Sequence, residues 1–384
     1  MRVLHILPSL DERSGGPLRA VLDLSFFAQA YGLESEVVGI GEVDVQDNLL
    51  QSSLIHSCHG DWFRSYSYSP RLRTWLHKNV KRFDGVVLHG MWLYPNLAAA
   101  QECIRFGVPY ACFPHGMLDP WAVGGQGWWK CIKKHVYWHL AEKMVFYNAE
   151  GALFATKREY ALARNAFSFL CLSSILPVFG ADRTVETVTM SPSDRVLKAA
   201  ASRYVLFLGR IHPKKNLEFL FRSWAQAKVQ AGWRLVIAGP GEDGYLAALN
   251  RMTKSLEIDD DVTFVDFVSG DDKKYLLKNA QWLILPSKQE NFGIVVLEAL
   301  QHGCPVAISD QVFLADELGN GVVTLKLRMD EWIQFFSGKM VDESYRRSRV
   351  ERGRELLFCN YSFQFIAELW TIAFGALFCQ RRAH

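Results

Sequence analysis

The chain contains the apolar run Trp282-Leu283-Ile284-Leu285-Pro286 and, three residues later, the stretch Glu290-Asn291-Phe292-Gly293-Ile294-Val295-Val296-Leu297-Glu298. A short apolar run that ends at Pro is typical of a buried strand, and the second stretch predicts an apolar-periodic helix continuing to Gln301. Glu290 is therefore expected at a strand-to-helix turn. Glu298 should lie about two turns further along, roughly 12 Å away if the segment is helical throughout.

The chemistry of such a turn suits an anionic or hydroxyl-rich ligand. A helix start presents unpaired backbone N–H groups, and Gly293 allows a ligand to approach the backbone closely. Carboxylates spaced like Glu290 and Glu298 can contact two parts of one elongated ligand, and a nucleotide-sugar is such a ligand. The alternative is structural, with one Glu near a helix N-terminus and the other on the helix surface.

Glu290, seven intervening residues and Glu298 are followed by Ala299-Leu300-Gln301-His302-Gly303-Cys304-Pro305-Val306. This arrangement resembles the E-x7-E signature and the E-A-x-x-x-G-x-P-V run of retaining glycosyltransferases of family 4. The resemblance implies that Glu290 binds hydroxyls of the donor sugar and that Glu298 binds the ribose. It also implies that the loop Asn291-Phe292-Gly293 belongs to the donor site, with backbone groups on phosphate or sugar oxygens.

Length and composition indicate an ordered globular chain of two to three domains, since 384 residues can bury more than one core. Lys and Arg number 43 and Asp and Glu number 40, so the net charge of +3 gives no indication of nucleic acid binding. The eight cysteines form no C-x-x-C pair, which favours reduced thiols in a cytosolic protein. The cluster His56-Ser57-Cys58-His59 lacks the paired spacing of zinc ligands, and no metal is expected.

Apolar strand-like runs alternate with amphipathic helical runs in both halves of the chain, which predicts parallel, doubly wound sheets in an α/β protein. We expect two Rossmann-like domains facing across a cleft, an acceptor-side domain over 1–181 and a donor-binding domain over 182–358. The resemblance assigns this arrangement to the GT-B fold, whose C-terminal helix, here 359–384, crosses back to the first domain. The expected strands are Val3–Leu7, Val37–Ile40, Val86–His89, Ala111–Phe113 and Leu153–Ala155, then Tyr204–Leu208, Leu235–Ala238, Val262–Val265, Trp282–Leu285 and Val306–Ile308.

Two places in the first half are candidates for donor contacts. Gly15 and Gly16 close the loop after the first strand, where they permit close backbone approach to a ligand or simply pack the turn. His115 follows a strand and precedes a Gly, which would place an imidazole at the ligand-facing edge, although a structural histidine is the alternative. The family has a Gly-rich loop facing the donor phosphates at the first place and a sugar-contacting His at the second. Residues 114–121 (PHGMLDPW) resemble a bacterial polysaccharide-synthesis subgroup.

The segment 128–143 predicts a basic helix rich in aromatic residues, beginning with Trp128 and Trp129. Such a face can lie on an anionic membrane or bind a lipid-linked phosphate. It can equally pack an aromatic stripe into the core and leave its lysines in solvent. Both interpretations stay open at this point.

The first strand of the second half runs into Gly209-Arg210-Ile211-His212-Pro213-Lys214-Lys215-Asn216. Arg and Lys at a strand end suit a diphosphate, because Arg forks two oxygens and Lys supplies a point charge. The segment resembles the Gly-Arg…Lys element of the family, which implies that Arg210 and Lys215 stabilise the leaving diphosphate. Asn216 replaces the usual Gly and still permits a left-handed residue.

Two further segments depart from the family pattern. In the family the segment after the third strand, here Asp266-Phe267-Val268, binds the base through its backbone, which makes Phe267 a donor-binding candidate. Asp266 stands where the family has Gly, so base contacts are less firmly implied than diphosphate contacts. The linker Leu176-Pro177-Val178-Phe179-Gly180 lacks the Asn of the family motif.

Gly239-Pro240-Gly241-Glu242-Asp243-Gly244 supports a competing hypothesis. It fits G-x-G-x-x-G between a strand and a helix, and Asp266 follows 22 residues later, as a dinucleotide-binding unit requires. The motif nevertheless follows the second strand of its domain rather than the first. A dehydrogenase would also leave Arg210, Lys215 and the two glutamates without a role.

The resemblance implies a metal-independent hexosyltransferase that retains anomeric configuration and needs no cofactor. UDP-glucose is the first expectation for the donor, ahead of UDP-galactose, UDP-N-acetylglucosamine and GDP-mannose. The acceptor would be a saccharide or lipid-linked saccharide in cell-surface polysaccharide synthesis. The expected catalytic residues are His115, Arg210, Lys215 and Glu290. A sugar-nucleotide epimerase, an NAD-dependent oxidoreductase and a membrane-associated binding protein without catalysis are the alternatives.

The two ends of the chain bear on the expected compartment. Arg2–Leu7 followed by Pro8 reads as a strand and not as a signal peptide. Tyr361–Cys379 is apolar but carries Gln364 and Glu368, which favours a buried or surface helix over a membrane span. We therefore expect a cytoplasmic protein, with peripheral attachment to the inner face of the plasma membrane if the segment 128–143 binds lipid.

Overall fold

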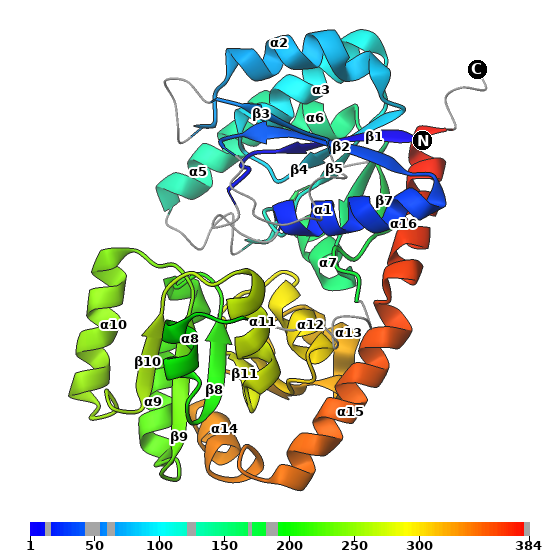
Figure 1. The fold of residues 1–384 in the computed structure, drawn as a ribbon. Helices are drawn as coiled ribbons and strands as arrows, with labels where there is room; N and C mark the ends of the chain where they lie inside the picture. Colours follow the sequence, from blue (N-terminus) through cyan, green and yellow to red (C-terminus); the bar gives the residue numbers. More distant parts are fainter. Residues whose placement is uncertain are drawn as a thin grey trace. The chain divides into compact units, whose positions relative to one another are not determined.

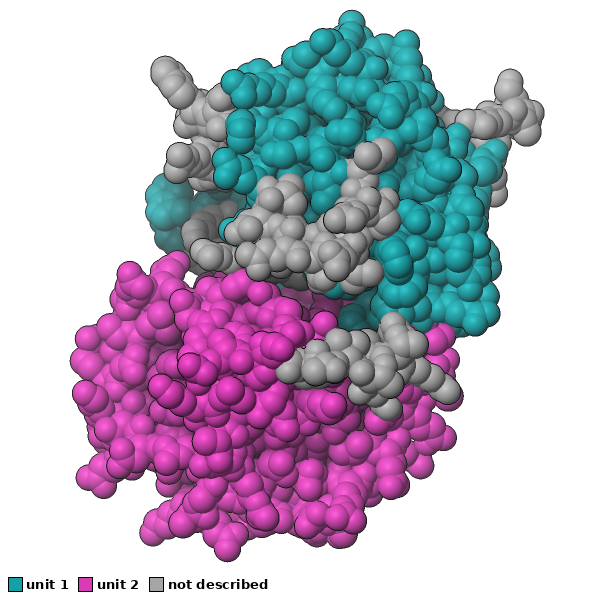
Figure 2. All heavy atoms as spheres, viewed as in Figure 1, with its two compact units in different colours: residues 1–180, 363–384 teal, residues 181–362 magenta. Residues whose placement is uncertain are grey.

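The structure is a computed structural model that describes residues 1–11, 17–42, 54–59, 66–120, 128–167, 171–181 and 191–379. The chain divides into two compact units, one formed by Met1–Gly180 with Phe363–His384 and the other by Ala181–Ser362 (Figure 2). The units divide between residues 180 and 181 and between residues 362 and 363. The boundaries expected from the sequence lie between 181 and 182 and between 358 and 359. Ala181 and Ser362 form a bridge with each other, so both belong to the second unit.

In the described residues of the first unit, a seven-stranded parallel sheet has the order β3-β2-β1-β4-β5-β6-β7 (Figure 1). Its strands are β1 (Arg2–Leu7), β2 (Glu34–Ile40), β3 (Leu54–Cys58), β4 (Gly85–His89), β5 (Tyr110–Phe113), β6 (Gly151–Phe154) and β7 (Leu172–Ile175). The helices are α1 (Pro17–Ala28), α2 (Pro70–Asn79), α3 (Tyr94–Phe106), α5 (Trp128–Tyr137), α6 (Lys143–Tyr147), α7 (Lys157–Ala166) and α16 (Phe363–Phe378), with a π-helical turn, η6 (Trp138–Glu142), between α5 and α6.

The second unit has a six-stranded parallel sheet in the order β10-β9-β8-β11-β12-β13 among its described residues (Figure 1). The strands are β8 (Arg203–Leu208), β9 (Trp233–Ala238), β10 (Val262–Val265), β11 (Trp282–Leu285), β12 (Val306–Ser309) and β13 (Val323–Leu325). The helices are α8 (Asp194–Ala199), α9 (Leu217–Ala227), α10 (Asp243–Ser255), α11 (Gly270–Asn279), α12 (Ile294–Gln301), α13 (Leu314–Leu318), α14 (Met329–Gln334) and α15 (Glu343–Asn360). The prediction of two Rossmann-like α/β domains is confirmed.

The C-terminal helix α16 packs on the sheet of the first unit, although it is the last element of the chain (Figure 1). Glycines at the start of β4 and β6 make room for it, because a Cβ on Gly85 would collide with the ring of Phe378 and one on Gly151 with Leu377. The indole N–H of Trp370 donates to the carbonyl of Pro177 at 2.9 Å. The first unit therefore completes its core only when the end of the chain has been made.

Three strands, β3, β7 and β13, were not expected from the sequence. Each is short, β7 is only partly buried, and β3 carries His56 and Ser57 beside apolar residues, so none forms an apolar run. Each is instead defined by parallel pairing with a neighbouring strand. Backbone hydrogen bonds with a partner far away in sequence cannot be read from local composition.

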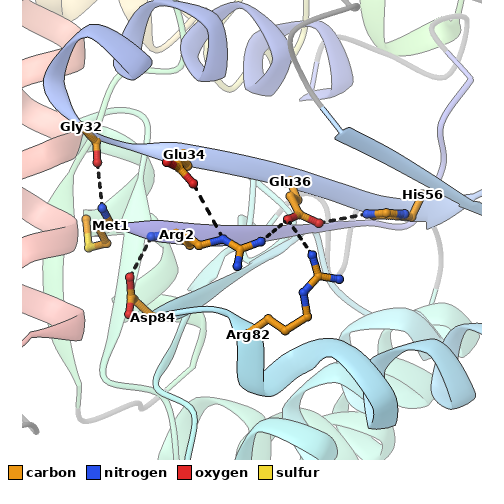
Figure 3. Close-up of polar contacts among 8 residues, drawn as sticks. All are labelled: Met1, Arg2, Gly32, Glu34, Glu36, His56, Arg82 and Asp84. Atoms are coloured by element: carbon orange, nitrogen blue, oxygen red, sulfur yellow. Dashed lines mark hydrogen bonds and ion pairs between the residues drawn. The ribbon is translucent and has the colours of Figure 1, made fainter.

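A buried carboxylate binds two arginines and a histidine near the amino ends of the first-unit strands (Figure 3). Glu36 Oε1 accepts from Arg2 Nη2 at 2.7 Å and lies 3.4 Å from Nη2 of Arg82, while its Oε2 lies 2.9 Å from Nε2 of His56. Burial works to raise the pKa of Glu36, but the hydrogen bonds from His56 and Arg2 and the charge of Arg82 outweigh it, and the pKa lies below its usual value. The cluster joins β1, β2, β3 and the segment before β4.

We expect Glu36→Gln to lower the free energy of unfolding of the first unit by about 1–3 kcal/mol at pH 7, because charge-assisted bonds to a buried carboxylate are lost. The folded pKa of Glu36 is depressed, so this stabilisation is present above its unfolded pKa and is lost as the pH falls through the folded value. Urea unfolding at pH 7 and at a series of pH values below 4.5 should therefore show a difference between wild type and variant that shrinks as the pH falls.

Glu34→Gln is the matched control for this prediction. Glu34 lies on the same strand, but its side chain is 74% exposed and its oxygen is 3.8 Å from the Arg2 guanidinium. The control should change stability by less than about 0.5 kcal/mol, as exposed ion pairs do. Equal losses in the two variants would show that the buried network contributes nothing of its own.

Candidate functional site

The second sheet has a switch point between β8 and β11, its two central strands. The chain runs from β8 to β9 and β10 on one side and from β11 to β12 and β13 on the other. Ligands of open parallel sheets bind at such a point, beyond the carboxyl ends of the strands. The loops that leave β8 and β11 here are joined by a backbone bond from the N–H of Lys288 to the carbonyl of Lys214, 2.8 Å long.

Lys215 and Glu290, predicted separately from two motifs, meet at this switch point. The ammonium of Lys215 donates to Oε2 of Glu290, and both side chains are largely buried. Lys215 ends a short 3-10 turn after β8, and Asn216 follows with a φ of 62°. Asn216 thus adopts the left-handed conformation that the sequence analysis said an Asn still permits, and α9 begins at the next residue.

The electrostatics of the β8 loop favour an anion. Burial, together with the charges of Lys214 and Arg210, lowers the pKa of Lys215 to about 7. Burial and Arg210 also lower the pKa of Lys214. Arg210 is exposed, and it forms no ion pair in the part of the chain that the structure describes. Arg210, Lys214 and Lys215 place three cationic groups in this loop with one carboxylate among them, and a bound diphosphate would stabilise all three charges.

The segment after β11 is a turn and not a continuous helix. Glu290 pairs with Val312, its carbonyl accepting from the N–H of Phe313 at 3.0 Å. Gly293 has a φ of 74°, and α12 begins only at the next residue. Glu290 therefore lies at a strand-to-helix turn, as the sequence predicted. A helix that includes residues 290 to 293 is wrong, because a left-handed Gly redirects the chain before the helix starts.

The neighbours of Glu290 in this turn have distinct environments. Phe292 is buried and its ring contacts that of Tyr361, edge to face, with centroids 6.4 Å apart. The side-chain oxygen of Asn291 is buried and accepts no hydrogen bond among the described residues. A buried acceptor without a donor is costly, so a ligand hydroxyl or N–H at this position would be favoured.

Glu298 lies on α12, and a residue that the sequence analysis missed binds it. The ammonium of Lys273, on α11, donates to Oε1 of Glu298 at 2.6 Å, with the Glu298 side chain 19% exposed. Nothing in the sequence around Lys273 distinguishes it from the adjacent Lys274. Only the packing of α11 against α12 selects it.

The backbone N–H and the carbonyl of Phe267 are both hydrogen-bonded to side chains of the protein. Its N–H donates to Oδ1 of Asp266 at 2.7 Å, and its carbonyl accepts from Nη2 of Arg195 at 2.7 Å. Arg195 also lies 3.4 Å from Asp272. These partners were not expected from the sequence, and a base that used the Phe267 backbone would have to displace them.

The competing Gly-rich motif is explained by packing. Gly239 follows β9, which lies one strand away from the switch point, and has a φ of 138°. A Cβ at this residue would collide with the carbonyl of Gly209, and Gly241 pairs with Ile211 beside it. The glycines therefore let the loops after β8 and β9 lie side by side, which requires no dinucleotide.

In the first unit, His115 follows β5 with a φ of 51° and is half-buried. Its loop is fixed by Glu159 on α7, whose Oε1 accepts from the N–H of Gly116 at 2.5 Å and whose Oε2 accepts from that of Ala155 at 2.7 Å. Glu159 was missed because its partners are backbone groups of other segments. The candidates Gly15 and Gly16 lie outside the described residues.

Among the described residues no group of three or more His, Cys, Asp or Glu side chains is arranged to hold a metal ion. No described helix combines the length and the apolar character needed to cross a membrane.

Residues 193–327, which hold every second-unit site residue described above, match the family model for glycosyl transferases group 1. The second unit contains a glycosyl transferases group 1 domain. The chain is also similar to an uncharacterized glycosyltransferase of Methanocaldococcus jannaschii, 30% identical over 43% of this chain and 43% of that protein. The O-antigen chain mannosyltransferase RfbU of Salmonella typhimurium is 30% identical over 41% of this chain and 44% of its own length. The chain thus spans less than half the length of these curated relatives.

Comparison with solved structures extends the likeness in fold beyond this domain. Anabaena HepE, crystallised with UDP and glucose, has a TM-score of 0.78 at 16% identity, covering 98% of this chain and all of that one. WaaG, a glycosyltransferase involved in lipopolysaccharide biosynthesis, has a TM-score of 0.73 at 14% identity over 96% of this chain and 99% of its own. The expected GT-B class of α/β fold, with two Rossmann-like domains, is therefore confirmed.

Proposed function

We propose that this protein is a retaining glycosyltransferase that moves a hexose from a nucleotide diphosphate donor to a saccharide or lipid-linked saccharide in cell-surface polysaccharide synthesis. The observation that carries the proposal is the Lys215–Glu290 pair beside Arg210, at the switch point of a glycosyl transferases group 1 domain. Glucose from UDP-glucose is the first candidate donor, supported by the likeness to HepE, which is described in complex with UDP-glucose.

In the proposed reaction, cationic groups of the β8 loop neutralise the leaving diphosphate. Arg210 forks two of its oxygens and Lys215 supplies a point charge, so the transfer proceeds without a metal ion. Glu290 orients the sugar through its hydroxyls, with the turn Asn291-Phe292-Gly293 against the phosphates or the sugar. Glu298 binds the ribose, Phe267 lies at the base, and His115 contacts the donor sugar.

Isothermal titration with UDP, GDP and NAD, each with EDTA present, tests this proposal. We expect micromolar binding of UDP that survives EDTA, and no binding of NAD. Binding of GDP in place of UDP would make GDP-mannose the proposed donor. GDP-mannose is the second candidate because the chain is similar to O-antigen mannosyltransferases. NAD binding without a response to either nucleoside diphosphate would overturn the proposal.

Product analysis separates transfer from epimerisation. Incubation of UDP-glucose with a saccharide acceptor should give a new glycoside and UDP. Conversion of the donor into another nucleotide-sugar without any acceptor would show an epimerase instead. The anomeric configuration of the glycoside, read by NMR, decides between retention and inversion.

We also propose that α5 and η6 dock on the anionic surface of a membrane, on its cytoplasmic side. Their exposed apolar stripe consists of large side chains about four residues apart, and lysines at 133 and 143 are exposed on the same segment. Trp138, in contrast, is buried, so the core-packing interpretation accounts for only part of the aromatic residues. The members of the stripe, with their exposed fractions, are Trp128 (63%), Trp129 (69%), Ile132 (47%), Val136 (52%) and Leu140 (79%).

Leu140→Asp should reduce partitioning onto vesicles that contain anionic lipid about tenfold, because one buried Leu contributes about 1.5–3 kcal/mol to membrane binding. Leu172→Asp is the matched control, since Leu172 is 67% exposed on β7, outside the stripe. Co-sedimentation with anionic and with zwitterionic vesicles measures the effect. Equal losses of vesicle binding in the two variants, or a wild type that does not bind anionic vesicles, would contradict docking through the stripe.

A further inference from the structure

Three histidines of the first unit form a hydrogen-bonded chain through the centre of its sheet. Nδ1 of His5 lies 2.9 Å from Nε2 of His89, and Nδ1 of His89 lies 2.8 Å from Nε2 of His115. The residues come from β1, β4 and the end of β5, which are consecutive strands in the sheet order. His5 and His89 are 2% and 1% exposed. The chain therefore connects the candidate residue His115 with the interior of the unit.

The surroundings hold each ring in place. Two side-chain N–H bonds from Asn96, to the carbonyls of His89 and Gly90, fix the end of β4. The ring of His5 lies 6.2 Å, centroid to centroid, from both Trp370 and Phe374 of α16. His5 also lines a small cavity with Ser35, whose buried hydroxyl has no partner among the described residues. The inner end of the histidine chain therefore lies beside a cavity where the hydroxyl of Ser35 can accept or donate a hydrogen bond.

The three imidazoles are neutral. Burial lowers the pKa of His5 and His115 to about 3, and burial with the two neighbouring histidines lowers that of His89 well below its usual value. A neutral imidazole carries one N–H, and its other nitrogen accepts. Each link joins a δ nitrogen to an ε nitrogen, so either all three rings carry the proton on Nδ1 or all three carry it on Nε2. A change of tautomer at one ring requires the same change at the other two.

We propose that His5 and His89 are positioning residues that fix the tautomer and orientation of His115. The hydrogen-bonded histidines decide whether Nδ1 of His115, the ring nitrogen that does not contact His89, donates or accepts a hydrogen bond. This decides which kind of contact His115 can make with a sugar oxygen. For that contact the inference rests on the proposed function, whereas the shared tautomer does not depend on it.

The first test needs no substrate. Two-dimensional 15N–1H spectra of protein labelled with 15N-histidine, assigned with His89→Gln and His115→Gln, report the tautomer of each ring. We expect one shared tautomer at neutral pH in the wild type and mixed tautomers at His115 in His5→Phe, a variant whose ring fits between Trp370 and Phe374. Different tautomers in the wild type, or an unchanged His115 signal in His5→Phe, would overturn the inference.

The second test measures transfer of the sugar. His5→Phe should lower kcat about tenfold, with a change in the donor KM of less than about threefold, because an orienting residue acts on the reacting group and not on donor affinity. His5→Asn keeps an amide N–H near the position of Nδ1 and should restore most of kcat. His59→Gln, a substitution at an exposed histidine, is the control and should change neither constant.

The outcomes of the two tests are distinguishable. A shared tautomer with kcat unchanged in His5→Phe would overturn the positioning role. If the wild type transfers no sugar at all, the proposed function fails, and the 15N spectra alone decide whether the chain fixes His115.

Discussion

Lys215→Ala should lower kcat/KM for sugar transfer by about a thousandfold, the loss typical when a group that stabilises developing charge is removed from an active site. The ammonium is largely buried beside Glu290, so no water-exposed cation can replace it. Its removal also leaves the Glu290 carboxylate without its cationic partner, which would disfavour an anionic ligand nearby. Steady-state kinetics with UDP-glucose, or with whichever donor binds, measure the effect.

Two variants separate this effect from a general loss of positive charge. Lys288→Ala removes an exposed lysine from the adjacent loop and should change kcat/KM less than about threefold. The double variant Lys215→Ala/Glu290→Gln should bind UDP more tightly than Lys215→Ala alone, because the uncompensated carboxylate is gone. A double variant that binds as weakly as the single one would show that Lys215 and Glu290 do not act on the same ligand.

The same lysine predicts how UDP binding depends on pH. The pKa of Lys215 is about 7 in the free protein, so the side chain is increasingly neutral as the pH rises from 7 to 9. A diphosphate favours the charged form and raises this pKa, and UDP binding must therefore take up protons in that range. UDP affinity should fall as the pH rises, by up to about tenfold per unit. Titrations in buffers of different ionisation enthalpy measure the uptake, which should be smaller in Lys215→Ala.

Glu298→Ala should weaken UDP binding about thirtyfold, because the hydrogen bonds of a charged carboxylate to ribose hydroxyls contribute about 1.5–3 kcal/mol each. Titration with UDP and with its 2′-deoxy analogue locates the effect on the ribose. The variant should lose most of the preference for UDP over the deoxy compound that the wild type shows. An unchanged preference would show that Glu298 does not bind the ribose.

Lys273→Ala decides between a ligand role and a structural role for Glu298. If Glu298 only anchors Lys273, through the 2.6 Å bond between α12 and α11, loss of either partner should have the same effect on stability and on binding. If Glu298 binds ribose, Lys273→Ala should change UDP affinity by less than about fivefold. The two results can be read from the same titrations together with thermal unfolding.

Local sequence determined the elements at the centre of both sheets. Val3–Leu7 and Trp282–Leu285 are apolar runs that are buried in the structure, and a strand buried on both faces needs such a run. Sequence also located the two ends of the candidate site, Arg210 to Lys215 and Glu290 to Glu298, because each motif is continuous. What a continuous segment encodes can be read from that segment alone.

Only the tertiary structure decided which side chains meet. Lys215 pairs with a residue 75 positions away, and His5 binds one 84 positions away. The short strand β3 exists because β2 offers it hydrogen-bonding partners. Gly293 delays the start of the expected helix to Ile294 through a backbone conformation that composition does not reveal. In each case the stabilisation comes from contacts or conformations that form when distant strands align. The residues next to each position in the sequence therefore do not predict them.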